Sequence, residues 1–145
     1  MIKITCGAFV IDKLGNILLC RATGSENDWT VPKGLLENDE MSHIAAKREL
    51  LEETGIDINK YPYMMYELGV WPYAHKNKVI VGFLFMVDAV INQTLFCESH
   101  FTSKLTGMRL PEVDMYQWLP INDALEIMRP EQVKLIKGFW SLTNV

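Results

Sequence analysis

The sequence has few cysteines, no long apolar run and no basic tract. Each of these features argues against one class of protein or partner. Cys6, Cys20 and Cys97 show no metal-ligand spacing, and their odd number argues against a disulfide scaffold. No apolar run is long enough to cross a bilayer, and no basic and then apolar leader opens the sequence. We therefore expect a cytoplasmic protein without a membrane-spanning segment.

The length of the chain indicates one domain, and its excess negative charge lies in one region. At 145 residues the chain suits a single domain, residues 1–145, with one sizeable core. Residues 37–53 hold six acidic and two basic side chains, which equals the whole net charge of −4. The remaining charges balance, so the chain lacks the basic excess that a long nucleic-acid partner requires.

The apolar pattern predicts strands and helices that form an α/β fold. A hairpin is expected from residues 2–12 and 17–22. Further strands are expected at residues 29–31, 63–71, 78–89 and 115–119. The strand at 78–89 should be central, because it is almost wholly apolar. Helices are expected at residues 41–54, 121–128 and 130–142, the last with Val133, Ile136, Phe139 and Trp140 inward. Residues 92–111 show no clear period and are expected to form a long loop.

The predicted helix at residues 41–54 is the most informative stretch. Glu49, Glu52 and Glu53 are spaced i, i+3 and i+4, so they lie on one side of a helix. Like charges at this spacing destabilise a bare helix by roughly a few tenths of a kcal/mol per pair. A hard divalent cation, which prefers oxygen ligands, would offset this repulsion. We therefore predict a magnesium-type site here, with a solvated acidic face as the alternative.

The other faces of this helix carry further expectations. Met41, Ile44 and Leu51 form the apolar stripe that we expect to face the core. Ala45 and Ala46 are expected on the side of the carboxylates, where small side chains leave room for hydrated ions.

The ends of this helix are also predicted. Asn38 or Asp39 should cap its start, and Gly55 should end it. Arg48 lies one turn before Glu52 and is expected to pair with it.

The residues around this helix resemble the signature of the Nudix hydrolases. That signature runs G-x5-E-x7-R-E-U-x-E-E-x-G-U, where U is a bulky aliphatic residue. The sequence matches every fixed position, namely Gly34, Glu40, Arg48, Glu49, Leu50, Glu52, Glu53, Gly55 and Ile56. The resemblance implies an α/β/α sandwich with a mixed sheet. It also implies metal-dependent hydrolysis of a diphosphate that is joined to another group, usually a nucleotide.

The resemblance assigns the metal site and the chemistry to this box. It implies that Glu52 and Glu53, with the backbone carbonyl of Gly34, bind Mg²⁺, for which Mn²⁺ can substitute. Glu49 is either a further metal ligand or the general base that takes a proton from water, and both interpretations stay open.

Other residues are expected to support this site. Arg48 and Glu40 should orient the carboxylates through hydrogen bonds, which makes Arg48 part of the catalytic group with Glu49 and Glu52. Outside the box, Glu112 resembles the acidic residue that often completes the family's metal site, and Glu98 is its alternative.

Lys33, Tyr73 and Lys78 are the candidates for substrate binding. The segment W-T-V-P-K-G at residues 29–34 resembles the W-T-x-P-K-G of asymmetrical diadenosine tetraphosphate hydrolases, so Lys33 is expected to contact a phosphate. Tyr73 and Lys78 flank a loop where a ring can stack on a base and an ammonium can bind phosphates. A solvated lysine and an ordinary basic hairpin loop are the alternatives.

A small nucleotide is therefore the expected partner, and a dinucleoside polyphosphate of the diadenosine tetraphosphate type is the leading substrate. RNA with a 5′-phosphorylated end, ADP-ribose and other nucleotide sugars, and inositol pyrophosphates are the alternatives. Residues 98–110 match nothing that we can place in the tetraphosphate hydrolases. A non-catalytic Nudix domain that senses a nucleotide is an alternative of another class. Such domains usually lose box carboxylates, and all are present here.

Overall fold

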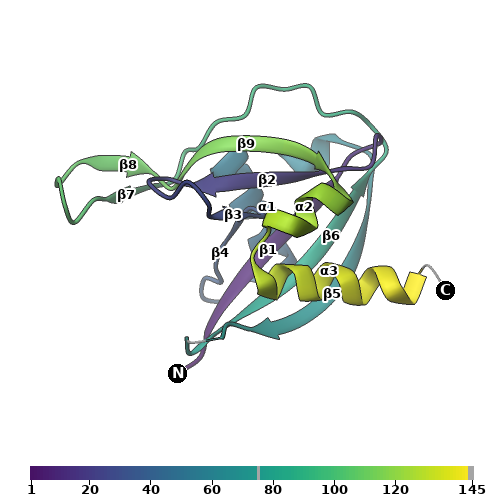
Figure 1. The fold of residues 1–145 in the computed structure, drawn as a ribbon, viewed down its shortest axis with the longest axis horizontal. Helices are drawn as coiled ribbons and strands as arrows, with labels where there is room; N and C mark the ends of the chain where they lie inside the picture. The colour runs from purple at the N-terminus through teal and green to yellow at the C-terminus, as the bar shows by residue number, and fades with distance from the viewer. Residues whose placement is uncertain (75, 144–145) are drawn as a thin grey trace.

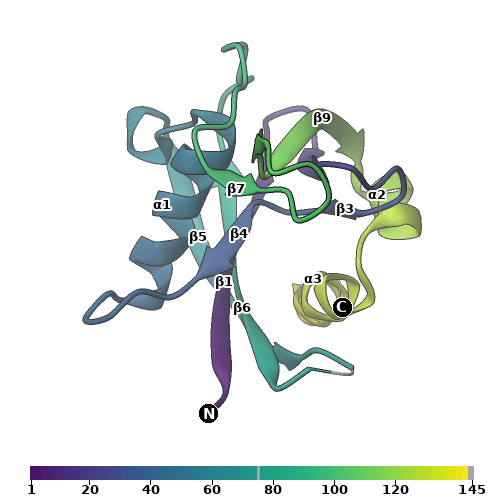
Figure 2. The same cartoon turned by 90° about the vertical axis from the view of Figure 1, so that its left-hand side faces the viewer.

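A mixed sheet separates helix α1 (Ser42–Thr54) from helices α2 (Ile121–Ile127) and α3 (Pro130–Thr143), as Figures 1 and 2 show. The computed structural model describes residues 1–74 and 76–143, with side chains up to residue 139. The predicted α/β/α sandwich is confirmed. Within the described residues, no helix combines the length and apolar character needed to span a bilayer.

The strand order explains why the sheet is mixed. The strands are β1 (Lys3–Ile11), β2 (Asn16–Ala22), β3 (Trp29–Thr30), β4 (Lys33–Leu35), β5 (Tyr63–Pro72), β6 (Lys78–Val87) and β9 (Val113–Pro120). In the described part of the chain the order is β3-β2-β1-β6-β5, with β4 paired to β1 and β9 paired to β2. Strands β1 and β6 are parallel, whereas β5 and β6 are antiparallel. The predicted central place of the 78–89 strand is confirmed, because β6 lies between β1 and β5.

The sheet divides beside β1, and this division makes room for a site. Strands β1 and β2 form the predicted hairpin, but they pair only where Ile11 meets Ile17. Strand β2 then pairs with β9 instead. The first half of β1 is left to β4, with Cys6 opposite Gly34. Strand β4, which the sequence did not predict, therefore crosses the opening between the two parts of the sheet.

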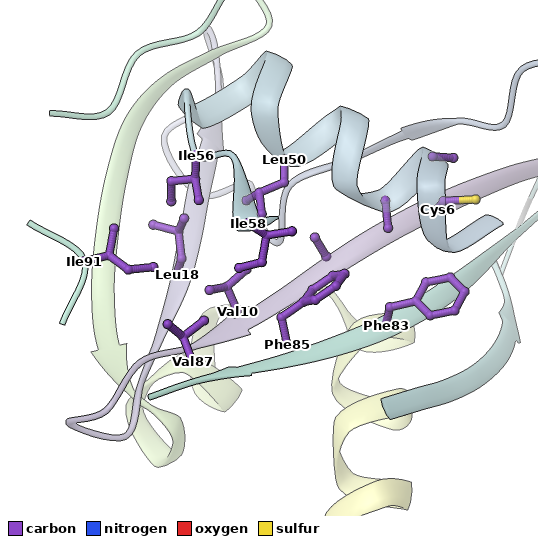
Figure 3. Packing of buried hydrophobic residues seen from close by; sticks show 13 residues of the cluster. Cys6, Val10, Leu18, Leu50, Ile56, Ile58, Phe83, Phe85, Val87 and Ile91 are labelled. Carbon is purple, nitrogen blue, oxygen red and sulfur yellow. The ribbon is translucent and has the colours of Figure 1, made fainter. Parts of the chain in front are cut away.

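Two apolar clusters hold the layers together. The first lies between the sheet and α1, and Figure 3 shows Val10, Leu50 and Phe85 among its members. The second lies between the sheet and helices α2 and α3. Cys6 and Cys20 are fully buried and pack as small apolar side chains.

The inward-facing residues predicted for the last helix are mostly confirmed. Ile136 of α3 is buried, and Val133 and Phe139 pack against the second cluster. The side chain of Trp140 lies outside the described residues.

The prediction for the buried face of α1 was wrong. Met41, Ile44 and Leu51 are 65%, 43% and 43% exposed. The buried residues of α1 are instead Ala45, Ala46, Glu49, Leu50, Glu53 and Thr54. The site lies on the sheet side of the helix, so one face carries both the core contacts and the carboxylates. Alanine side chains allow the helix to approach β1 closely, which excludes the larger aliphatics from that face.

The start of α1 was also mispredicted. Met41, not Asn38 or Asp39, occupies the N-cap position, and no side chain of the described residues caps this end. Asp39 instead adopts a positive φ of 64° in the preceding turn. The predicted end is confirmed, because Gly55 is left-handed and its N–H donates to the carbonyl of Leu51.

Residues 92–111 are ordered by contacts rather than forming a loop without structure. We call residues 93–99 the strap, because they bind the end of α1. The N–H of Glu98 donates to the carbonyl of Glu52 (2.6 Å), and that of Phe96 donates to the carbonyl of Thr54 (3.1 Å). Strands β7 (His100–Thr102) and β8 (Arg109–Pro111) then form a hairpin that protrudes from the body (Figure 1). The loop prediction is confirmed for residues 92–99, which form no helix or strand, and is wrong for β7 and β8, which are too short for local periodicity to reveal.

We expect Gly55→Ala to destabilise the protein more than Gly15→Ala. Both glycines are left-handed, with φ of 79° and 81°. A Cβ at Gly55 would lie 2.5 Å from the Phe96 ring of the strap, whereas no described atom lies within 4 Å of one at Gly15. The backbone cost of each alanine is about 1 to 2 kcal/mol, and the clash should add about 2 kcal/mol at Gly55 only. Urea unfolding measures both, and equal losses would contradict the packing of Phe96 on the end of α1.

Candidate active site

A cavity of about 630 Å³ opens beside β4, between α1 and the two parts of the sheet. Four carboxylates line it, namely Glu49, Glu52, Glu53 and Glu112, and we call the part of the wall that they form the acidic end. The lining also includes Thr5, Thr30, Lys33, Lys78 and Asp28, and we call the part around Lys78 the basic end. Lys33 lies next to the acidic end, because its N–H donates to Glu53. All the candidate residues of the box except Glu40 therefore line one cavity, together with two of the three predicted substrate contacts.

Arg48 organises the acidic end. Its guanidinium donates to both oxygens of Glu40, at 2.7 and 3.0 Å, and to Oε1 of Glu49 at 2.8 Å. It also donates to Glu52 at 3.2 Å and to the carbonyl of Leu35 at 3.1 Å. The predicted pairing of Arg48 with Glu52 is therefore present. The guanidinium ties the loop after β4 to helix α1.

These contacts have electrostatic consequences. The hydrogen bond from Arg48 lowers the pKa of Glu40 below its ordinary value. The same hydrogen bond, with the charge of Glu49, raises the pKa of Arg48, although burial opposes this. The Arg48–Glu40 pair is thus fully ionised at neutral pH and provides a fixed anchor for the other carboxylates.

Glu49 and Glu53 are the buried carboxylates of the site, at 6% and 4% exposure. Burial raises the pKa of Glu49 to about 7, and Arg48 opposes this rise. Burial raises the pKa of Glu53 to about 8, although the backbone N–H of Lys33 donates to its Oε1 at 3.0 Å. Both carboxyl groups bind a proton more strongly than an exposed glutamate does. The reason is that hydrogen bonds and nearby positive charges do not fully replace the water that burial removes.

Gly34 allows β4 to approach Glu49. A Cβ at this position would lie 2.1 to 2.3 Å from the carboxyl atoms of Glu49. No side chain larger than hydrogen fits there, so the backbone of the box glycine lies directly against the buried carboxylate. The predicted proximity of Gly34 to the acidic residues is therefore present.

The residues of the acidic end fit a divalent cation that keeps open positions. Among the described residues, no three Asp, Glu, His or Cys side chains converge into a closed metal cage. Magnesium-type ions usually take one or two carboxylates and complete their shell with water and substrate phosphates. Buried carboxylates with raised pKa values, such as Glu49 and Glu53, lack the positive charge that such an ion supplies.

Glu112 lies closer to this site than its alternative. It lines the cavity, and its charge adds to burial in raising the pKa of Glu49 and Glu53. Glu98 lies in the strap, where its backbone N–H binds the carbonyl of Glu52. The structure thus brings Glu112, rather than Glu98, to the carboxylates.

At the basic end the predicted contacts differ in exposure. Lys33 and Lys78 line the cavity. Tyr73 does not, because it is 6% exposed and belongs to the second apolar cluster. The ammonium of Lys78 lies 4.9 Å from the centre of its ring, and the Arg129 guanidinium lies at 5.6 Å. The expected stacking of a base on Tyr73 is therefore wrong, because the ring is already packed. His75 in the same loop lies outside the described residues.

Gln132 supports the site and was not predicted. It is fully buried in α3, where its side chain accepts from the N–H of Val31 at 3.0 Å and donates to the Thr30 hydroxyl at 2.5 Å. These bonds fix the end of β3, next to Lys33. In the sequence, the indication of this role is that Gln132 is an amide among the apolar residues of the predicted helix at 130–142.

Tyr116 supports the acidic end from β9. Its hydroxyl donates to the backbone carbonyl of Glu53 at 2.5 Å, and its ring packs against the first cluster. This side chain positions the end of α1 and is not available for stacking on a substrate.

Comparison with known proteins gives consistent matches. The NUDIX domain profile matches residues 1–139. Over 148 residues the chain is 28% identical to the uncharacterized 17.7 kDa protein in the e-segB intergenic region of Enterobacteria phage T4, with 97% of each covered. Over 51 residues it is 39% identical to the RNA pyrophosphohydrolase of Wolbachia pipientis, which covers 35% of this chain and 32% of that protein. The Ap4A hydrolase of C. elegans in a binary complex shares the fold, with a TM-score of 0.70, 20% identity, and 99% and 98% of the two chains covered.

We expect the metal-free protein to lose stability as the pH rises from about 5 to 8. Folding raises the pKa of Glu49 and Glu53 from 4.5 to about 7 and 8, so the folded state binds more protons than the unfolded state in this window. Stability therefore falls as the pH rises through it. Thermal unfolding in EDTA measures the slope, which should be smaller in Glu53→Gln and unchanged in a control, Glu126→Gln, on the exposed side of α2.

Magnesium should reverse this trend, because it binds the deprotonated carboxylates. The increase in Tm on adding Mg²⁺ should be larger at pH 8 than at pH 6. An equal increase at both values would contradict a metal site built on these buried groups.

Proposed function

This chain belongs to the Nudix family, and we propose that it hydrolyses a phosphoanhydride bond of a dinucleoside polyphosphate, with diadenosine tetraphosphate as the leading substrate. The family membership makes it a hydrolase of pyrophosphate bonds, and Nudix hydrolases generally use divalent metal ions. All carboxylates of the box are present. The choice of substrate depends on one observation, the presence of several carboxylates and two lysines in the lining of one cavity.

Basic side chains gather around Lys78 in the wall of the cavity. Burial lowers the pKa of Lys78, and the charges of Lys33, Lys76, Arg129 and Lys3 lower it further. Arg129 is ion-paired with Asp28 and Glu131. Within the part of the chain that the structure describes, none of the four lysines forms an ion pair. This end therefore favours an anion.

A polyphosphate chain suits a cavity with these two ends. The phosphates at the acidic end require a cation, and further phosphates would reach Lys33 and Lys78. A dinucleoside polyphosphate carries enough phosphates to occupy both ends, whereas ADP-ribose carries a single diphosphate. The fold shared with the C. elegans Ap4A hydrolase and the P-K-G segment agree with this choice.

The proposed roles follow from the positions of the side chains. Glu52 and Glu53, with the carbonyl of Gly34, would hold Mg²⁺ or Mn²⁺, and Glu112 would add to this set. Such an ion supplies positive charge to the phosphates and lowers the pKa of bound water. Glu49 is suited to accept a proton near neutral pH, because its own pKa is about 7.

The remaining parts of the reaction fall to other residues. The water oxygen bonds to phosphorus, its proton passes to a carboxylate, and the phosphoanhydride P–O bond breaks. Arg48 keeps Glu49 and Glu52 oriented during this exchange, anchored by its pair with Glu40. Lys33 and Lys78 bind the phosphates that lie beyond the scissile bond.

An RNA 5′-end is the second candidate substrate. The partial match to an RNA pyrophosphohydrolase supports it, and a 5′-triphosphate would also extend from the carboxylates to the lysines. The balanced charge outside residues 37–53 favours the small nucleotide instead, because an RNA chain needs further basic contacts.

A panel assay with product identification tests the proposal. With Mg²⁺, diadenosine tetraphosphate should be cleaved to ATP and AMP with a higher kcat/KM than 5′-triphosphorylated RNA, ADP-ribose or nucleotide sugars. Faster cleavage of ADP-ribose to AMP and ribose 5-phosphate would overturn the choice of substrate. The absence of any turnover would favour a nucleotide-sensing domain.

We expect Glu53→Gln to reduce kcat at least about a thousandfold, which corresponds to roughly 4 kcal/mol of barrier. The substitution keeps the size of the side chain and the acceptor for Lys33, but it removes a ligand charge. Circular dichroism and a urea midpoint near the wild-type value would show that folding is intact. Full activity would contradict the assignment of Glu53.

We expect Lys78→Gln to raise the KM for diadenosine tetraphosphate about tenfold, because one charged contact to a phosphate is lost. The KM for ADP-ribose should change less than threefold. Lys60→Gln, on the exposed short helix η1 (Ile58–Lys60), is the matched control. A similar rise for both substrates would place Lys78 at a phosphate that all substrates share.

A further inference from the structure

A second cavity adjoins the active-site cavity and has no assigned role. It has a volume of about 430 Å³ and is lined by Met1, Lys3, Leu35, Lys76, Asn77 and Lys78. Leu35 and Lys78 also line the active-site cavity, so the two cavities meet at these side chains. We call the second cavity the lysine pocket.

The pairing of β1 with β6 brings lysines together in this pocket. The starts of the two parallel strands lie side by side (Figure 1), and Lys3 is directly opposite Lys78, so their side chains share one face of the sheet. The N–H of Lys3 donates to the carbonyl of Asn77 at 3.1 Å, and the side-chain amide of Asn77 donates to the carbonyl of Met1 at 2.8 Å. These backbone contacts hold the two lysines next to each other.

Lys76 adds a third positive charge to the pocket. Its ammonium lies 6.0 Å from the centre of the Tyr73 ring, and the ammonium of Lys78 lies 4.9 Å from the same centre. One buried ring therefore holds both ammonium groups beside the pocket.

This arrangement is unfavourable while the pocket is empty. Like charges directly opposite one another in a sheet are destabilising. Among the described residues, no acidic side chain lines the pocket, and none of its three lysines forms an ion pair. Burial, and then the charges of nearby basic residues that include Lys76 and Lys3, lower the pKa of Lys78. A bound anion would reduce the repulsion among all three lysines.

The position of the pocket favours a phosphate as this anion. The pocket adjoins a cavity whose carboxylates and lysines suit a polyphosphate chain, and Lys78 belongs to both walls. A chain that is bound in the active-site cavity and continues past Lys78 would therefore enter the lysine pocket.

We propose that the lysine pocket is a phosphate subsite, in which Lys3 and Lys76 bind a phosphate of the substrate that extends beyond Lys78. The inference rests on the proposed function in that the substrate carries a phosphate chain. It adds a preference for long chains, because a longer chain gains contacts to Lys3 and Lys76 that a shorter one lacks.

Titration of the metal-free protein with inorganic tripolyphosphate tests the subsite without turnover. In buffer without divalent ions the carboxylates repel phosphates, so the measured binding reports on the lysines. The double variant Lys3→Gln, Lys76→Gln should bind tripolyphosphate about tenfold more weakly than the wild type. The control, Lys60→Gln with Lys137→Gln, makes the same change of charge on exposed lysines that line neither cavity, and it should bind like the wild type.

The double variant should keep its fold, because Lys3 and Lys76 are exposed. Its Tm should be no lower than that of the wild type, since the repulsion between Lys3 and Lys78 is removed. Wild-type affinity for tripolyphosphate in this variant would overturn the subsite. If inorganic phosphate binds as tightly as tripolyphosphate and is weakened equally, the pocket is a site for free phosphate and the assignment to the substrate chain is wrong.

Kinetics with Mg²⁺ test the preference for long chains. The double variant should raise the KM for diadenosine pentaphosphate about tenfold and leave kcat unchanged, whereas the KM for diadenosine triphosphate should change less than threefold. An equal rise for both substrates would overturn the assignment of the pocket to the far part of the chain. If neither substrate is cleaved and the double variant still binds tripolyphosphate more weakly, the choice of substrate fails and the subsite stands.

Discussion

The site depends on the guanidinium of Arg48. It contacts carboxylates that would otherwise repel one another, Glu40, Glu49 and Glu52, and it also holds the carbonyl of Leu35. A lysine could not replace it, because an ammonium has three donors at one point, whereas a guanidinium has five in a fixed plane. The loop after β4 and helix α1 therefore have one relative position, and this position brings Gly34 against Glu49.

The sequence predicted those parts of the site that local spacing determines. Carboxylates at i, i+3 and i+4, an arginine one turn earlier and a glycine at the helix end suffice to predict the acidic end of the cavity. The buried face of α1 was predicted wrongly, because a hydrophobic pattern assumes that the largest aliphatic residues face the core. Here Ala45 and Ala46 do so, and Ile44 remains exposed. A helix that must present carboxylates toward its own sheet cannot also place bulky side chains there.

Parts of the site that depend on distant contacts were not predictable. The strap binds backbone carbonyls at the end of α1, and a backbone group leaves no mark in the sequence. Gln132 reaches β3 across about a hundred positions of the chain, and only the fold reveals that it fixes the strand before Lys33. Strands β7 and β8 have three residues each, which is too short for alternation to distinguish them from a loop.

The same cavity collects groups that oppose folding in the absence of ligand. Glu49 and Glu53 are buried carboxylates with raised pKa values, and both line it. Such groups would only weaken the protein if they were scattered through the fold. Because both line one cavity, a bound cation would compensate them together, so binding and folding would be coupled. Each carboxylate is poorly suited to the empty protein for the same physical reason that suits it to the cation: its buried negative charge lacks a balancing positive charge.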